Sequence, residues 1–458
     1  MNNGIASGEM IDIIGVGFGP ANIALAIAAE ELYPNLVVHF LESSNEPGWQ
    51  DGMLLPESDI QNHPLRDLVT PRNPRSRYTF VNFLHEKDRL FEHLNLPLSH
   101  PLRIEYREYV RWVAKFFDDK VSYGARVVKI TPIISNDTID HYVVSDSIGC
   151  QYKARSVVVA PGRTPNIPPV FSACNDPRAV HFTQFLREFE AILSRCSNPK
   201  IAVIGGSQTA VELMLHLSGD HRVGEVIGVH RNFGYRLKDT SPFSDEVYFP
   251  AYVDLYHRAT SEQKEKLREE LRPTNYSSAD RDVLDSLYIT LYRNMISGSK
   301  RIRVENLVNV SKVVSEQDKI VLHLDSEIRK FNRSESFDFV VLATGFKDFG
   351  ISSSDERTHP LFDGVAAALD LSSGYMAISR NYSVELLPKY KNGSSPIFAN
   401  GLCESSHGMG DAGSFSLLSL RAKEILDAYS EVLYHSKKKQ ALLTKSTEIL
   451  HRPTEQLV

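Results

Sequence analysis

The sequence is poor in cysteine. Its 458 residues include four, Cys150, Cys174, Cys196 and Cys403, which lie far apart, and no Cys-x-x-Cys pair occurs. A disulfide framework is therefore not expected, and buried free thiols in a reducing cytosol are the simplest interpretation.

The chain also lacks long apolar runs and a large excess of one charge. No run approaches the ~20 apolar residues that span a bilayer. The N-terminus has no positive segment followed by an apolar core, so we expect a cytoplasmic protein. The net charge is −6 and no basic stripe with interleaved aromatics occurs, which gives no sign of a nucleic-acid partner.

Metal ligands and repeats are missing as well. His63, His181 and His407 stand singly, without a second ligand at metal-binding spacing, so we predict no metal site. Apart from two glycine-rich turns described below, internal repeats are absent, and so are low-complexity segments. The length and the ordinary composition instead fit two or three globular domains with real cores.

A glycine-rich turn near the N-terminus is the strongest motif that is present. The apolar run at residues 11–14 predicts a buried strand, Gly15, Gly17 and Gly19 follow, and Pro20 opens a helical run rich in Ala and Leu. Glycines allow a tight turn and let the backbone approach a pyrophosphate, which then binds at the positive end of the helix. The motif predicts a dinucleotide site.

A second strand, at residues 37–42, strengthens this prediction. It ends in Glu42, at the distance where such folds hydrogen-bond an adenosine ribose. Strand, turn, helix and second strand in this order are more specific than a glycine motif alone.

A second turn of this kind lies in the middle of the chain. An apolar strand from residue 201 leads into Gly205 and Gly206, and a helix follows. The next strand is followed by Arg231 rather than by an acid, and an arginine can pair with a 2′-phosphate. This favours NADPH over NADH, although a surface arginine at a strand end is the alternative.

These units predict an α/β fold with two Rossmann-like dinucleotide-binding domains. We expect residues 1–170 to form the first part of an FAD domain and residues 171–335 an NADPH domain. The NADPH domain would include a mostly helical substrate-binding segment at about 240–300. Residues 336–458 would form the second part of the FAD domain, which is therefore discontinuous in sequence. The return is suggested by the apolar strand that ends in Ala-Thr-Gly at residues 343–345.

The acceptor of electrons from the reduced flavin is inferred by excluding alternatives. A dithiol–disulfide reductase needs a cysteine pair near the first turn, but the first cysteine is Cys150. Nothing resembles a nucleophile elbow or a catalytic triad. Oxygen remains as the natural acceptor for a reduced flavin.

Motifs along nearly the whole chain resemble the flavin-dependent N-hydroxylating monooxygenases, the ornithine and lysine N-monooxygenases of siderophore biosynthesis. These motifs occur in the family's order, at residues 15–22, 52–55, 66–74, 78–84, 274–276 and 343–345. The resemblance implies FAD and NADPH as cofactors and O₂ and a small primary amine as reactants. It also implies a flavin C4a-hydroperoxide that N-hydroxylates the terminal amine, and a homo-oligomer, since tetramers are common in the family.

The resemblance also implies roles for individual residues. Gln61, Trp49 and Met53 would line the flavin cavity, although core packing is an equal alternative for Trp49 and Met53. Ser207 and Gln208 would face NADPH, and Arg231 its 2′-phosphate. Asn275 would contact the substrate, or alternatively cap the next helix. The remaining residues implied are Thr344, Gly345 and Asp411 at the cofactors and Ser416 at the substrate.

Departures from the family pattern leave the amine open. Arg66 stands where a lysine usually binds the substrate carboxylate, and Asp245 stands where asparagine is common. Arg66 can still pair with a carboxylate, whereas Asp245 suits a second cationic group, and the two could also neutralise each other. Gln50 replaces a usual histidine, and the segment 408–416 is one residue longer. Ornithine, lysine, histamine, putrescine and cadaverine all remain candidates.

Two other functions stay open. The first is another flavin monooxygenase, which would oxidise a ketone, sulfide or tertiary amine. Such an enzyme is expected to have a Phe-x-Gly-x-x-x-His-x-x-x-Trp type of segment between the two turns. That segment is absent here, and the nearest match in this region is the short sequence Val-His-Phe-Thr-Gln at residues 180–184. A nucleotide-binding protein without turnover is the second, and the intact glycines argue against it. No residue is singled out by spacing as a catalytic base.

Overall fold

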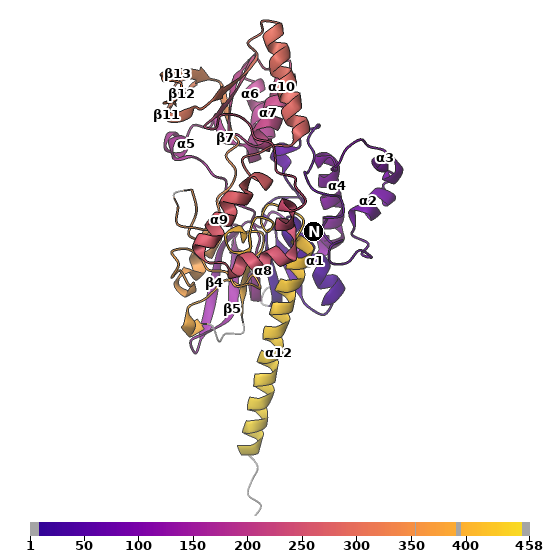
Figure 1. The fold of residues 1–458 in the computed structure, drawn as a ribbon. Coiled ribbons are helices and arrows are strands. Elements are labelled where there is room, and N and C mark those ends of the chain that lie inside the picture. Colours follow the sequence, from indigo (N-terminus) through magenta and orange to yellow (C-terminus); the bar gives the residue numbers. More distant parts are fainter. Residues whose placement is uncertain (1–8, 353, 391–394, 451–458) are drawn as a thin grey trace, which may run out of the picture.

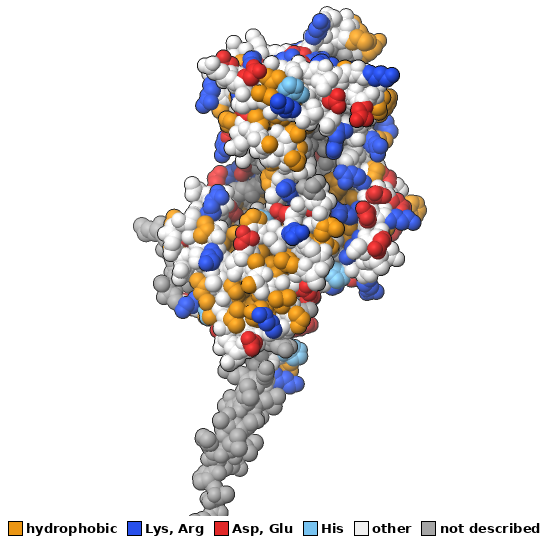
Figure 2. Space-filling view, turned by 90° about the vertical axis from the view of Figure 1, so that its left-hand side faces the viewer, with side chains coloured by type: hydrophobic (Ala, Val, Ile, Leu, Met, Phe, Trp, Pro, Cys, Tyr) orange, Lys and Arg blue, Asp and Glu red, His pale blue; other side chains and the backbone are white. Residues whose placement is uncertain are grey.

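The computed structural model describes residues 9–352, 354–390 and 395–450. The chain forms two α/β units, and the second lies above the first in Figure 1. Figure 2 shows the same two lobes with a constriction between them. No helix among the described residues is long and apolar enough to cross a membrane.

The first unit is built on a sheet that has seven strands within the described residues, in the order β3-β2-β1-β6-β5-β4, with β15 beside β6. β1, β2, β3, β6 and β15 run parallel, and β4 and β5 form an antiparallel insertion. The strands are β1 (Met10–Val16), β2 (Val38–Leu41), β3 (Val121–Ser122), β4 (Val127–Ser135), β5 (Thr138–Asp146), β6 (Gln151–Val159) and β15 (Ile397–Ala399).

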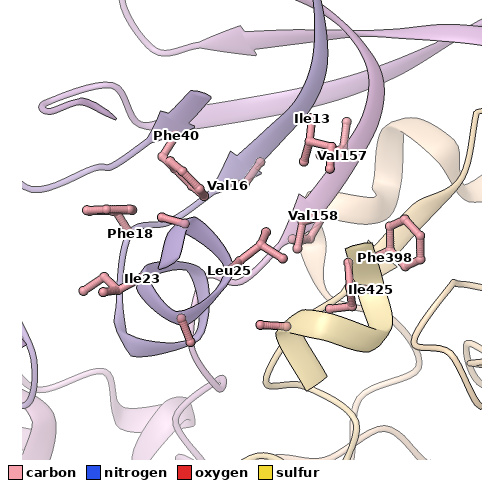
Figure 3. Packing of buried hydrophobic residues seen from close by; sticks show 14 of the residues in the cluster. Ile13, Val16, Phe18, Ile23, Leu25, Phe40, Val157, Val158, Phe398 and Ile425 are labelled. Atoms are coloured by element: carbon pink, nitrogen blue, oxygen red, sulfur yellow. The ribbon is translucent and has the colours of Figure 1, made fainter. Parts of the chain in front are cut away.

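Two helices distant in sequence pack together against this sheet. They are α1 (Pro20–Leu32) and α12 (Leu418–Leu450). Figure 1 shows that α12 extends well beyond the body of the molecule. Figure 3 shows their shared core, where Leu25 of α1 and Ile425 of α12 lie beside Val158 of β6. The central strands are apolar on both faces because helices cover them, as parallel sheets require.

The second unit has a parallel sheet of five strands within the described residues, in the order β10-β9-β8-β14-β7. Its strands are β7 (Ala179–His181), β8 (Lys200–Ile204), β9 (Glu225–His230), β10 (Ile302–Asn306) and β14 (Phe339–Leu342). Its helices are α5 (Pro169–Cys174), α6 (Phe185–Leu193), α7 (Gln208–Gly219) and α10 (Arg281–Ile296). A small antiparallel sheet adjoins it, formed by β11 (Asn309–Ser315), β12 (Ile320–Ser326) and β13 (Phe331–Phe337).

The remaining elements surround the junction of the two units or lie on their surfaces. They include α4 (Arg103–Ala114), and Pro273 interrupts the predicted helical segment 240–300 within η5. The other helices are α2 (Phe80–Glu86), α3 (Leu90–Leu94), α8 (Pro250–Arg258), α9 (Ser261–Leu271) and α11 (Glu404–His407). The 3₁₀ turns are η1 (Asp51–Met53), η2 (Lys115–Lys120), η3 (Phe182–Gln184), η4 (Ser244–Tyr248), η5 (Arg272–Thr274), η6 (Pro360–Ala368) and η7 (Pro388–Tyr390).

One predicted boundary needs correction. β14 pairs with β8 and β7, so residues 339–342 belong to the second sheet, although the predicted NADPH domain ends at residue 335. After β14, the first described strand that joins the first sheet again is β15. The fold class itself agrees with the prediction, including a first domain made from two separate segments. Residues 1–8 and 451–458 of the predicted domains lie outside the described residues.

Candidate active site

The turn between β1 and α1 has the form of a phosphate site. Gly17 has φ +84°, and a Cβ there would overlap the carbonyl oxygen of Ala160. At Gly19 a Cβ would meet no atom within 4 Å, so the turn is open on that side. α1 begins at Pro20 with no side-chain cap and no acid in its first turn. The uncapped, positive end of this helix therefore fits a pyrophosphate.

Glu42 lies beside this turn, directly after β2. One oxygen of its carboxylate accepts from the Phe18 N–H at 2.7 Å, and the other accepts from the Ser44 N–H at 2.7 Å. Glu42 is thus held at the end of the strand, where an acid can bind a ribose hydroxyl.

Asp411 lies under the same turn, but it is fully buried. Its carboxylate accepts from the Cys403 N–H at 3.0 Å and from Arg421 of α12 at 2.7 Å. Arg421 in turn donates to Asn400 at 2.7 Å, and Asn400 donates to Asn22 of α1 at 3.0 Å. Asp411 therefore supports the turn through this chain of side chains rather than by direct exposure.

Arg421 and Asn400 could not be identified from the sequence, because nothing in their local spacing marks them. The Arg421 Nη2 atom is buried without a hydrogen-bond partner. A Cβ added at Gly401 would lie 3.6 Å from this nitrogen. It would lie equally far from the Cβ of Ala21 in α1, so the nitrogen is close to the start of that helix. An unpaired buried donor beside an uncapped helix start is a second feature that fits an anionic ligand.

The residues predicted at the flavin ring are placed differently from one another. Trp49 is half-buried and lies edge-on to Tyr106 and to Phe415, with ring centroids 5.9 and 5.2 Å away. Met53 is 3% exposed and packs into the core of the second unit. Core packing, the alternative left open, thus describes the Met53 side chain.

Gln61 lies where the two units meet. Its backbone is left-handed, with φ +50°, and its side-chain Nε2 donates to the Asp280 carboxylate. The Asp280 N–H donates to the Oε1 of Gln208 at 2.8 Å, and Gln208 donates to Glu212 at 3.0 Å. The structure therefore brings together Gln61 and Gln208, which the sequence assigned to different cofactors.

The second glycine turn, between β8 and α7, repeats the features of the first. Gly205 has φ +153°, and a Cβ there would overlap the carbonyl oxygen of Ala343. Ser207 precedes α7 without capping it by its side chain, and the first turn of α7 contains no acid. Arg231 is exposed directly after β9, at the carboxyl edge of the parallel sheet. This placement fits a nucleotide phosphate.

Thr344 and Gly345 follow β14 and join the two connections between the units. The Thr344 hydroxyl donates to the Asn166 carbonyl at 2.6 Å, and the Asn166 N–H donates to the Gly345 carbonyl at 2.9 Å. Burial lowers the pKa of His181 to about 4, so its neutral ring donates to the same Gly345 carbonyl at 2.9 Å. Both residues also line a cavity of about 200 Å³, which residues of α8 and α9 line as well.

Two predicted substrate residues lie around Tyr248. The Arg66 guanidinium lies 5.5 Å from the centre of the Tyr248 ring, and Asp245 is in the same 3₁₀ turn as Tyr248. Burial raises the pKa of Tyr248, and the charge of Asp245 raises it further while that of Arg66 lowers it. Among the described residues, no ion pair joins Arg66 to Asp245. The structure thus shows no direct pairing of the two charges.

The other two predicted substrate residues lie along the segment 408–416. A Cβ at Gly413 would lie 3.5 Å from the Asn275 amide nitrogen. Asn275 does not cap a helix start, since α10 begins behind Asp280. Ser416 is hydrogen-bonded to Ser414 at 2.7 Å. The same segment passes Tyr248 at Gly410, so it contacts both halves of the predicted substrate site.

A buried charge cluster beside Asn275 was not foreseen. Arg163 donates to the Tyr276 hydroxyl at 3.0 Å and to Asp348 at 2.7 Å, and Tyr276 donates to Glu404. Glu404 is 5% exposed, and burial raises its pKa to about 7, although the Arg163 charge opposes the shift. Only Tyr276 stands in a motif that the sequence analysis used.

The fold and the two turns define a class: flavoproteins that bind two dinucleotides on separate parallel sheets, with a polar site where the sheets face each other. The model of the L-lysine 6-monooxygenase/L-ornithine 5-monooxygenase family matches residues 9–348. The chain belongs to this family. Membership confirms the predicted class of enzyme, a flavin-dependent N-hydroxylating monooxygenase, and the two predicted cofactors, FAD and NADPH.

Individual relatives agree along the whole chain. The L-ornithine N(5)-monooxygenase of Pseudomonas aeruginosa is 34% identical over 435 residues, which cover 93% of this chain and 95% of that protein. The structure of a Kutzneria sp. 744 ornithine N-hydroxylase with reduced FAD, NADP⁺ and L-ornithine superposes with a TM-score of 0.83 at 30% identity, covering 92% and 99%. An L-lysine 6-monooxygenase from Pseudomonas syringae gives 0.79 at 31% identity, covering 92% and 99%.

Proposed function

We propose that this enzyme hydroxylates the terminal amine of L-ornithine or L-lysine. The overall reaction converts R–NH₂, O₂, NADPH and a proton into R–NHOH, water and NADP⁺. The family match supports the reaction type, and the features of the site support the choice of an α-amino acid among the candidate amines.

The two turns would hold the two cofactors. FAD would lie on Gly15, Gly17, Gly19 and Glu42, and NADPH on the turn at Gly205 with Arg231 at its 2′-phosphate. Bound FAD, once reduced by NADPH, supplies the activation of O₂. The protein contributes orientation of the amine and exclusion of water from the junction of the two units.

The observation that carries the substrate proposal is that, in the part of the chain that the structure describes, no ion pair joins Arg66 to Asp245. Because the two side chains do not pair, each is available to a ligand of opposite charge. The α-carbon of ornithine or lysine carries both an ammonium and a carboxylate. Asp245 would take the first and Arg66 the second, whereas a decarboxylated amine would leave the Arg66 guanidinium without a partner.

The test is a panel of amines with purified enzyme, FAD, NADPH and O₂. Ornithine, lysine, histamine, putrescine and cadaverine are compared by hydroxylamine formed, in wild type, Arg66→Ala and Asp245→Asn. We expect product from ornithine or lysine, and a rise in KM of about ten- to a hundredfold in Arg66→Ala, since a charge-assisted bond is lost. Product from a decarboxylated amine alone, unaffected by Arg66→Ala, would contradict the proposal.

The resemblance supports two further proposals about the context of the enzyme. We infer a homo-oligomer, specifically a tetramer, and a role in the synthesis of a hydroxamate siderophore. The cytoplasmic location stays a prediction.

A further inference from the structure

We propose that Asp280 is a positioning residue that fixes which end of the Gln61 amide faces the flavin site, and that it couples Gln61 to the NADPH turn. This inference rests on the proposed placement of the two cofactors. It concerns the hydrogen-bond chain from Gln61 through Asp280 to Gln208.

The direction of the first bond follows from the chemistry of the partners. A carboxylate only accepts hydrogen bonds, so the Gln61 Nε2 must face Asp280 and the Gln61 Oε1 must point away from it. Among the described residues the Gln61 Oε1 has no hydrogen-bond partner. Gln61 therefore presents an acceptor, not a donor, to the flavin side.

The backbone of Gln61 shows that this orientation is held from outside. Its φ of +50° is in the left-handed region, which a residue with a side chain adopts only when its surroundings impose it. Two bonds impose it here. The Gln61 N–H donates to the Asp59 carboxylate at 3.0 Å, and the Gln61 amide donates to Asp280.

Asp280 does not serve the helix it precedes. Aspartate is a preferred residue at a helix N-cap because its side chain can accept from the first turn. Asp280 occupies the N-cap of α10, yet its side chain makes no capping bond. Its carboxylate is directed to Gln61, with the Lys238 ammonium 3.9 Å from the other oxygen. Helix stability alone therefore does not explain this side chain.

The backbone of Asp280 reaches the second cofactor turn. Its N–H donates to the Gln208 Oε1 at 2.8 Å, and the Gln208 N–H donates to the Ser278 carbonyl at 2.9 Å. Gln208 is the first residue of α7, directly after Ser207. A dinucleotide phosphate on this turn would lie beside Gln208, so Asp280 is shared between the two cofactor sites.

The experiment uses the FAD-loaded enzyme and two readouts. The first is the change in the visible flavin spectrum when NADP⁺ is added, which needs no turnover. The second is the hydroxylamine formed per NADPH consumed. The variants are Asp280→Ala, Asp280→Asn and the control Asp282→Ala, which removes an exposed acid from the first turn of the same helix.

We expect Asp280→Ala to lose the NADP⁺-induced spectral change and to lower the yield of hydroxylamine per NADPH about tenfold. Asp280→Asn should be intermediate, because its amide can hold Gln61 in either orientation. Asp282→Ala should match wild type. A wild-type spectrum that does not respond to NADP⁺, or an Asp280→Ala enzyme that keeps the response and the yield, would overturn the proposal.

An exchange of the two side chains tests the orientation without depending on Asp280→Ala being folded. Gln61→Glu alone places two carboxylates together and should lose the spectral response. In the double variant Gln61→Glu with Asp280→Asn, the asparagine amide donates to one oxygen of the glutamate, and the other oxygen remains an acceptor toward the flavin. This variant should therefore regain the spectral response to NADP⁺. A double variant no better than Gln61→Glu would contradict the proposal. If wild type makes no hydroxylamine from any amine, the proposed function fails while these spectra still decide the role of Asp280.

Discussion

At the scale of single residues, Glu404 carries a buried charge next to the proposed substrate site. Its neighbours are Arg163, Tyr276 and Asp348, and burial outweighs the attraction of Arg163, so its pKa rises from the usual range of a glutamate to about 7. A raised carboxyl pKa means that the folded state holds the proton more tightly than the unfolded state. Its favourable contribution is complete below about pH 4.5 and is lost as the pH rises through about 7.

Glu404→Gln should therefore change the pH dependence of stability in one direction. Between pH 4.5 and 7.5 the wild type loses up to about 3 kcal/mol through this group, whereas glutamine cannot ionise. In thermal unfolding across this pH range, the stability of the variant relative to that of the wild type should increase as the pH rises. A difference between the two proteins that does not vary with pH would contradict the account of Glu404.

The sequence identified some of these residues and could not identify others, for a physical reason. Gln208 stands directly after a glycine turn, and Asn275 and Tyr276 form a motif of adjacent residues, so their positions are local information. Arg163, Asp348 and Glu404 belong to three segments far apart in the chain. Nothing in their spacing indicates that they meet, because they are brought together by the pairing of β15 with β6 and by the pairing of the connections that follow β6 and β14.

At the scale of elements, the turn between β1 and α1 contains one glycine that the fold requires and another that ligand binding requires. Gly17 needs its positive φ and has no room for a Cβ, because of the Ala160 carbonyl. Gly19 has an ordinary φ of −81° and open space around its Cα. One glycine is thus required by the fold, and the other by the approach of a ligand.

We predict that Gly17→Ala and Gly19→Ala fail in different ways. Gly17→Ala should destabilise the protein by about 1–2 kcal/mol from its left-handed backbone alone, and further through the clash. Gly19→Ala should melt like wild type without cofactor but retain less FAD, because its Cβ occupies the space that a pyrophosphate needs. Melting temperature without FAD and bound FAD per chain measure both effects. Equal loss of stability in the two variants would contradict this division.

Strand β14 shows where prediction of elements from the sequence fails. Its residues, Phe339–Leu342, are all buried, as is typical of a parallel strand covered on both faces. Such a run predicts a buried strand correctly, but it has no polar face to indicate which sheet it joins. The apolar run alone therefore does not indicate the sheet, and the predicted boundary at residue 335 lies before this strand rather than after it.

At the scale of the whole molecule, the chain crosses from the first sheet to the second after β6 and back after β14, and the segment between β9 and α10 also reaches the first unit. The two crossings are paired, through Asn166 with Gly345 and Thr164 with Lys347. A buried ion pair between Arg103 of α4 and Glu212 of α7, at 3.0 Å, adds a further contact between the units. Gln61, Gln208 and Asp280 are therefore brought to the same junction, where both cofactors would meet the amine.

The most direct test of this account is the origin of the oxygen in the product. Purified enzyme with FAD, NADPH and L-ornithine or L-lysine is supplied with ¹⁸O-labelled dioxygen, and the product is analysed by mass spectrometry. The account predicts a hydroxylamine that carries one labelled oxygen atom on the terminal nitrogen. NADPH consumption that yields only hydrogen peroxide, or a hydroxylamine whose oxygen comes from water, would contradict it.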